Sequence, residues 1–203
     1  MNTAVLAIDI GASSGRHMLG QIEDGKLTLK EIYRFPNGAE KKNGHLCWNH
    51  RALWKHILAG MKKCAELGVI PASVGVDTWG VDYVLVDENG RMLSDGIAYR
   101  DDRTQTVLDK LPDEMLYRET GIAKQSFNTV YQLMTEPKER LQKAHRLLFT
   151  PDYFHYLLSG KMANEYTIAS TGALLDPSTR SWNTEVLHMA GIPENLFPEA
   201  PKM

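Results

Sequence analysis

The chain has 203 residues, with 23 Lys and Arg against 25 Asp and Glu, so its formal net charge is −2. This near balance argues against a protein held to nucleic acid or to an anionic membrane by bulk charge. Hydrophobic residues make up 43% of the sequence and charged residues 24%, which is typical of a globular protein rather than a disordered one. The length allows one large domain or two small ones, and because no change of composition marks a linker, we treat residues 1–203 as a single structural unit.

The cysteines and the N-terminus point to a compartment. Cys47 and Cys64 are too few for a disulfide framework and have no zinc-type spacing, so we expect reduced thiols that are buried or half-buried. The N-terminus shows no basic segment ahead of its apolar run, and we identify no signal peptide. No apolar stretch approaches the roughly 20 residues of a membrane-spanning helix. These features predict a cytoplasmic protein.

The first part of the chain predicts a sheet. Residues 5–10 are mostly aliphatic and too few for a helix of ordinary length, so they predict a buried strand. Residues 16–22 and 27–33, separated by an Asp-Gly hairpin signal, predict two more strands and complete three consecutive antiparallel strands. The Gly-, Lys- and Asn-rich residues 37–45 predict an exposed loop.

A long helix and further strands follow. Asn49 predicts the N-cap of an amphipathic helix that ends at Gly68. Residues 74–76 and 81–86 predict short strands, and an Asn-Gly turn precedes residues 91–93. This order of three antiparallel strands, a crossover helix and more strands predicts an α/β fold with a mixed sheet and flanking helices.

Helices predominate from about residue 101 onward. Apolar periodicity interrupted by Gly or Pro predicts them. The predicted helices cover residues 104–111, 113–120, 129–134, 138–144, 152–158 and 184–190. Residues 147–149 predict one short strand among them.

The first candidate site lies between the first two predicted strands, where residues 9–16 read Asp-Ile-Gly-Ala-Ser-Ser-Gly-Arg. Small residues let the backbone approach an anion, the hydroxyls of Ser13 and Ser14 can donate to phosphoryl oxygens, and Arg16 adds a cation. Asp9 is then placed to hold Mg²⁺ through water. The segment is neither a Walker A loop nor a G-x-G-x-x-G fingerprint. A hairpin with an incidental acid at the end of a strand is the alternative.

A second candidate site covers residues 77–83, which read Asp-Thr-Trp-Gly-Val-Asp-Tyr. It lies where one predicted strand ends and another begins, a position at which open sheets commonly place ligands. Its two acids can accept hydrogen bonds from hydroxyls, and Trp79 offers an apolar face, a combination that suits a polyhydroxylated ligand. The alternative is a core tryptophan with acids in a turn.

The third candidate covers residues 99–104, which read Tyr-Arg-Asp-Asp-Arg-Thr. As a site, Arg100 would donate to sugar hydroxyls while an Arg–Asp network fixes its geometry. As a solvated helix start, with acids meeting the helix dipole, the segment needs no function. The seven histidines have no metal-ligand spacing, and we expect them at structural or surface positions.

Taken together, these segments resemble the FGGY family of carbohydrate kinases, members of the actin/hexokinase-like ATPases whose sheet has a ribonuclease H-like fold. The matching segments, in the family's order, are residues 9–16, 75–82, 99–104, 120–122, 127–129, 151–153 and 158–160. The resemblance covers nearly the whole chain. The Ala-Ser-Ser-Gly-Arg loop, together with Asp-Thr-Trp-Gly-Val-Asp, is most similar to the branch of the family that phosphorylates L-rhamnulose.

The resemblance implies transfer of the γ-phosphate of ATP to the 1-hydroxyl of L-rhamnulose, with Mg²⁺. It implies that Asp9 organises the metal. The residues that it assigns to the ATP phosphates are Ala12, Ser13, Ser14, Gly15 and Arg16. The residues that it assigns to the sugar are Gly80 and, as weaker neighbours, Trp79, Tyr99, Arg100 and Phe127.

The resemblance also implies that parts of the kinase are missing. The family's catalytic aspartate belongs to a His-Asp-Thr-like motif that does not occur here, so we expect no catalytic residue in this chain and a base beyond Met203. We expect residues 1–203 to be an incomplete N-terminal domain, inactive alone, that needs the C-terminal, adenine-binding half of the same kinase. Two alternatives stay open: a kinase of another ketose, such as L-fuculose or xylulose, and a non-catalytic sugar-binding or oligomerisation module.

Overall fold

The computed structural model describes residues 4–202. They form two compact units, described here one at a time. The first unit runs as far as Glu40 and again over Trp48–Trp79, and the second takes Lys41–Cys47 and the chain from Gly80 onward. No linker could be recognised in the composition of the sequence, which is why the sequence suggested a single structural unit.

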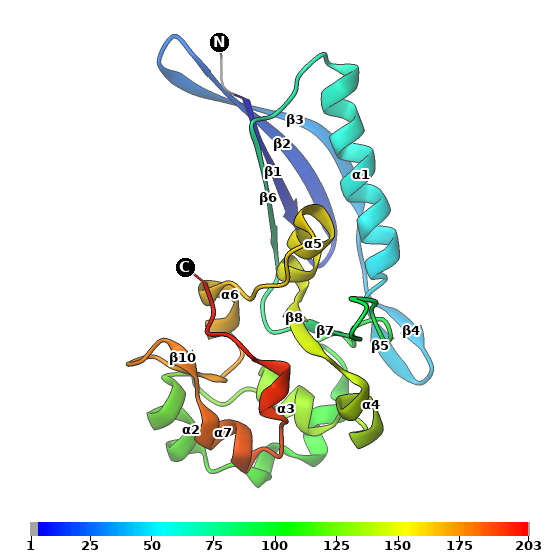
Figure 1. Cartoon of the computed structure of the whole chain (residues 1–203). Helices are drawn as coiled ribbons and strands as arrows, with labels where there is room; N and C mark the ends of the chain where they lie inside the picture. The colour runs from blue at the N-terminus through cyan, green and yellow to red at the C-terminus, as the bar shows by residue number, and fades with distance from the viewer. Residues whose placement is uncertain (1–3, 203) are drawn as a thin grey trace. The chain divides into compact units, whose positions relative to one another are not determined.

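A mixed four-stranded sheet forms the first unit (Figure 1). β1 (Ala4–Ile10) pairs antiparallel with β2 (Ser14–Glu23) and parallel with β6 (Ser73–Thr78). β3 (Lys26–Pro36) pairs antiparallel with the outer side of β2. The helix α1 (His50–Glu66) connects β3 to β6 and packs on β2 and β3. The three predicted antiparallel strands and the crossover helix are therefore confirmed.

The helix α1 begins at the predicted cap, because the Asn49 side chain accepts from the N–H of Ala52 at 3.0 Å.

The contact of α1 with the sheet depends on a glycine. On the buried face of the helix, a Cβ at Gly60 would lie 2.2 Å from the ring of His17. That ring is buried, its Nε2 lies 3.2 Å from the carbonyl oxygen of Ile57, and burial lowers the pKa of His17. Only glycine leaves room for this neutral ring.

We predict that Gly60→Ala destabilises the protein by about 1–3 kcal/mol, because the new methyl group overlaps the His17 ring. This loss outweighs the gain of ~1 kcal/mol that alanine ordinarily brings to a helix. The matched control is Gly75→Ala in β6, where a Cβ would meet nothing within 4 Å, and it is expected to be neutral or slightly stabilising. Urea unfolding measures both, and equal effects of the two changes would contradict the packing argument.

Short helices and small sheets make up the second unit. β7 (Tyr83–Val86) pairs antiparallel with β8 (Arg146–Phe149), and both strands are largely buried. The other strands are two hairpins, β4 (Glu40–Lys42) with β5 (His45–Cys47) and β9 (Leu175–Asp176) with β10 (Ser181–Trp182). The helices are η1 (Asp102–Thr106), η2 (Leu108–Lys110), α2 (Asp113–Thr120), α3 (Thr129–Met134), α4 (Lys138–Lys143), α5 (Thr150–Ser159), α6 (Tyr166–Ser170), α7 (Thr184–Met189) and η3 (Glu194–Leu196). One apolar core packs most of these elements together, and Leu85, Leu133 and Phe149 are fully buried in it.

Several predicted elements need correction. The exposed loop predicted over residues 37–45 instead contains most of the β4–β5 hairpin, which is joined to residues further along the chain by the ion pair of Lys42 with Asp95. The helix predicted over residues 104–111 is two 3₁₀ turns, η1 and η2. The strand predicted over residues 81–86 pairs with β8 and not with the four-stranded sheet. The helices α2 and α3 match the predicted ranges residue for residue.

Two expectations from composition can be compared with the structure. Both cysteines are free and buried, as predicted, and burial raises the pKa of both thiols. Within residues 4–202, no helix combines the length and the apolarity needed to span a membrane.

Asp152, in the first turn of α5, is an acid held in the interior of the second unit. Its side chain is nearly inaccessible, and its Oδ1 accepts from the N–H of Glu165 at 3.2 Å. Burial raises the pKa of Asp152 to about 7, and the nearby carboxylate of Glu165 adds to the rise. The carboxyl therefore binds its proton more tightly in the folded chain than in the unfolded one.

We predict that Asp152→Asn removes a pH dependence of stability. The protonated carboxyl favours the fold below about pH 4, and this contribution is lost as the pH rises through about 7. The free energy of unfolding of the wild type, minus that of the variant, should fall by up to about 1.4 kcal/mol per pH unit over that window and level off above it. Urea unfolding across the window measures this difference, and parallel pH profiles for the two proteins would contradict it.

Candidate functional site

The loop between β1 and β2, in the first unit, is held in place by the end of β3. The N–H of Gly11 donates to the carbonyl of Ser14 at 2.9 Å. Asn37 donates twice, from its N–H to the carbonyl of Ser13 at 2.9 Å and from its side-chain amide to the carbonyl of Gly11 at 2.8 Å. These bonds fix the loop in a conformation that leaves Ser13 exposed. Such a preorganised run of small residues suits an anion.

Gly15, at the start of β2 directly after this loop, must lack a side chain. A Cβ at this position would lie 2.1 Å from the ring of Phe35 on β3. The Phe35 ring in turn stacks on His56 of α1, with ring centroids 4.3 Å apart. The glycine therefore lets the loop lie directly on the core of the first unit.

Asp9 and Arg16 face each other across β1 and β2 at the mouth of this loop. They are register partners, and Arg16 Nη2 lies 2.8 Å from Asp9 Oδ2. Both side chains are roughly half exposed, so the pair contributes little to stability and remains accessible to a ligand. On its other side, Asp9 is the register partner of Asp77 on β6. A half-exposed carboxylate beside an anion-accepting loop fits Mg²⁺, which prefers one or two carboxylates together with phosphate oxygens.

The structure places the predicted sugar residues in two sets. Trp79 ends the first unit and packs against Trp48, with ring centroids 4.1 Å apart. The others, Gly80, Tyr99, Arg100 and Phe127, belong to the second unit and are treated with it below.

Three of the predicted sugar residues in the second unit lie together. The ring of Tyr99 meets the ring of Phe127 edge to face, with centroids 6.3 Å apart. The guanidinium of Arg100 lies 5.3 Å from the Tyr99 ring, and its Nε donates to the tyrosine hydroxyl at 3.0 Å. Phe127 is 38% exposed and Arg100 is exposed as well. This surface offers an aromatic face and a cationic donor, which together can hold a sugar.

Gly80 begins a tight turn in the same unit. The N–H of Asp82 donates to the carbonyl of Gly80 at 2.8 Å, which closes a γ-turn around Val81. A Cβ at Gly80 would lie 3.0 Å from the hydroxyl oxygen of Thr171. The turn therefore lies close against α6 and its end.

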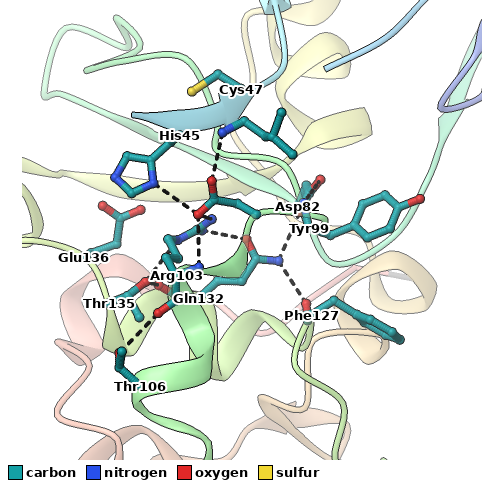
Figure 2. A network of polar contacts seen from close by, with 12 residues as sticks. His45, Cys47, Asp82, Tyr99, Arg103, Thr106, Phe127, Gln132, Thr135 and Glu136 are labelled. Carbon is teal, nitrogen blue, oxygen red and sulfur yellow. Dashed lines mark hydrogen bonds and ion pairs between the residues drawn. The ribbon is translucent and has the colours of Figure 1, made fainter. Parts of the chain in front are cut away.

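A buried polar network joins these segments (Figure 2). At its centre, the side-chain amide of Gln132 donates to Asp82 Oδ1 at 3.0 Å and to the carbonyl of Phe127 at 2.9 Å. Its oxygen accepts from Arg103 Nη2 at 2.8 Å. The other carboxylate oxygen of Asp82 accepts from the N–H of Tyr99 at 3.0 Å. The backbone beneath the exposed surface is thus connected through one glutamine.

Asp101 and Arg103 extend the network toward β5. Asp101 accepts from the N–H of Leu46 at 2.8 Å and from the N–H of Arg103 at 3.2 Å, and it caps η1. Burial alone would raise the pKa of Asp101, but the hydrogen bonds from Leu46 and His45 outweigh it and lower that pKa. Arg103 also donates to the hydroxyl of Thr135 at 3.0 Å. Residues 99–104 are therefore held by the hydrogen bonds of the buried Asp101 and are not simply a solvated helix start.

Gln132 and Thr171 were not predicted from the sequence. Neither belongs to a segment that pointed to chemistry, although α3 itself was predicted. The one available signal was a glutamine between Tyr131 and Leu133 in a short helix whose neighbours are apolar. Within residues 4–202, no three His, Cys, Asp or Glu side chains gather as a metal cluster.

The solved structures that this fold resembles are sugar kinases. A gluconate kinase from Lactobacillus acidophilus matches with a TM-score of 0.86 and 16% identity, over 98% of this chain and 42% of that one. A xylulose kinase from the same organism matches with a TM-score of 0.85 and 16% identity, over 97% of this chain and 41% of that one. At such identities the likeness concerns the fold alone. It confirms the predicted α/β fold with a mixed sheet and flanking helices.

The chain belongs to the FGGY family of carbohydrate kinases, because the model of the family's N-terminal domain matches residues 4–202. A rhamnulokinase of Halalkalibacterium halodurans is 46% identical over 201 residues, covering 96% of this chain and 43% of the relative. A rhamnulokinase of Enterococcus faecalis is 46% identical over 198 residues, covering 95% and 40%. The chain thus spans about two fifths of the length of the curated relatives it matches. The resemblance read from the sequence is confirmed.

Proposed function

We propose that this chain is the sugar- and phosphate-contacting N-terminal domain of an ATP-dependent kinase that converts L-rhamnulose to L-rhamnulose 1-phosphate. The observation that carries the proposal is the 46% identity to rhamnulokinases over nearly the whole chain. Those relatives are more than twice as long as the matched region. We assign the adenine-binding domain and the catalytic base to that additional length, and the enzyme would act in the cytoplasm.

On the phosphate side, the loop between β1 and β2 would bind ATP. Phosphoryl transfer requires the protein mainly to position the reactants and neutralise charge. The backbone and hydroxyls of residues 12–15 would donate to phosphoryl oxygens, and Arg16 would supply a fixed cation. Asp9 would hold Mg²⁺, which when bound shields the phosphate charge during transfer.

On the sugar side, the exposed surface of the second unit would hold the ketose. The rings of Tyr99 and Phe127 would cover an apolar face of the sugar, and Arg100 would donate to its hydroxyls. Gly80 would let the sugar approach the backbone, because it carries no side chain. The family resemblance also assigns Trp79, at the end of the first unit, to the sugar.

We predict that Asp9→Ala in the full-length gene product lowers kcat by at least ~100-fold, because the metal loses its carboxylate. The KM for L-rhamnulose should change by less than about threefold, since Asp9 acts on the phosphate side. The matched control is Glu31→Ala, which removes another exposed, ion-paired acid of the same sheet and should leave both constants near wild type. Equal losses in turnover and in sugar affinity would contradict the metal role.

The function itself is tested by a ketose panel. The full-length gene product should phosphorylate L-rhamnulose with a kcat/KM at least about tenfold above those for L-fuculose and D-xylulose, measured by ADP release. A preference for another ketose would show that L-rhamnulose is not the substrate. If the protein phosphorylates no ketose with ATP, the proposal is refuted. The 203-residue chain alone should show no turnover, because the assigned base and adenine site lie outside it. Turnover by that chain would contradict this assignment.

A further inference from the structure

The turn that begins at Gly80 has a backbone conformation that its sequence disfavours. Val81 has φ +64°, in the left-handed region, where a β-branched residue is a clear outlier. The hydrogen bond from the N–H of Asp82 to the carbonyl of Gly80 makes it a classic γ-turn, which is rare and strained. Such a conformation persists only where its surroundings enforce it.

Three side chains enforce this turn. The N–H of Val81 donates to the hydroxyl oxygen of Thr171 at 3.0 Å. The carbonyl of Val81 accepts from the hydroxyl of Thr129 at 2.7 Å and from the amide of Gln132 at 3.2 Å. Thr129 is fully buried and Gln132 is only 1% exposed, so water does not compete for these bonds.

Gln132 does more than the two threonines, because its amide also reaches the other sugar-side segments. The two N–H groups of its amide serve three acceptors, so that one of them is shared: besides the Val81 carbonyl they reach Asp82 Oδ1 and the carbonyl of Phe127. Through Asp82 the amide is also linked to the N–H of Tyr99. Figure 2 shows these bonds converging on one side chain that comes from α3. The orientation of the amide is set by Arg103, which donates to its oxygen at 2.8 Å.

We propose that Gln132 is a positioning residue for the sugar site, holding the strained turn at Val81 and the backbone of Phe127 and Tyr99 in a single arrangement. This inference rests on the proposed function, because it takes the sugar to bind over Gly80, Tyr99 and Phe127. Gln132 itself is buried and acts only through these segments.

The chemistry of the side chain accounts for the choice of glutamine. The nitrogen faces only acceptors, and the oxygen faces a guanidinium donor. A glutamate would direct an oxygen at the carboxylate of Asp82 and would lose the donors. A methionine would fill a similar volume but would leave buried acceptors without partners.

The test is a KM-against-kcat comparison in the full-length gene product. Gln132→Met and Gln132→Glu should raise the KM for L-rhamnulose at least about tenfold and leave the KM for ATP within about twofold. The matched control is Leu133→Ala, which removes a fully buried side chain next in the same helix but outside the network. It should lower the melting temperature without changing either KM.

Two further variants separate positioning from general stability. Val81→Gly, added to Gln132→Met, should restore part of the lost sugar affinity, because glycine adopts a positive φ without enforcement. Thr129→Ser keeps the hydroxyl donor and should have a KM for L-rhamnulose near wild type, whereas Thr129→Val should raise it. If the Gln132 variants do not fold, the two Thr129 variants test whether the held turn at Val81 positions the sugar site, and an unchanged sugar KM in Thr129→Val would overturn that positioning.

The outcomes are distinct from those of the function test. Unchanged sugar KM in the folded Gln132 variants of an active kinase would overturn the positioning role while leaving the proposed function intact. An equal rise in the KM for ATP and for the sugar would overturn it as well. Failure of the wild type to phosphorylate any ketose would instead refute the function on which the inference rests.

Discussion

The hydrogen bonds to the backbone N–H and carbonyl of Val81 are the constraint on which the proposed sugar site of the second unit depends. Without them, a valine would leave the left-handed region, and Gly80 would no longer lie against Thr171. The bonds come from α3 and from the end of α6, two short helices that the core of the unit holds in place. The packing of the core thus keeps the turn at Val81 in its strained conformation. This is how a protein can maintain a strained conformation at a functional site.

In the first unit, the proposed phosphate site is held by a different set of contacts. Here the backbone of a small-residue loop is fixed by Asn37 from the end of β3, and Gly15 lets the loop lie on the ring of Phe35. The charged groups, Asp9 and Arg16, are half exposed and paired with each other on the strands beside it. A rigid backbone with accessible charges suits a ligand that brings its own phosphate oxygens and metal.

Local patterns predicted the elements whose formation depends on nearby residues. The strands β1 to β3 follow from aliphatic runs separated by turns, and α1 from its Asn49 cap and apolar periodicity. The β4–β5 hairpin could not be predicted, because its segment is polar. It is held by contacts with distant residues, such as the bond from the N–H of Ala98 to the carbonyl of Leu46. Likewise, the sequence could not show that β7 pairs with β8 and not with the four-stranded sheet, because β8 lies far along the chain.

The same distinction applies to the site. Recognisable segments identified Asp9, Arg16, Tyr99 and Phe127, and their roles stay predictions until a ligand is bound. The importance of Gln132 could not be predicted, because two of its acceptors, on Val81 and Asp82, lie about 50 residues earlier in the chain, and a glutamine among apolar neighbours does not reveal them. The most direct test of the account is a structure of the full-length gene product with L-rhamnulose bound. We predict that the sugar lies against the rings of Tyr99 and Phe127. A sugar bound elsewhere would contradict the proposed site.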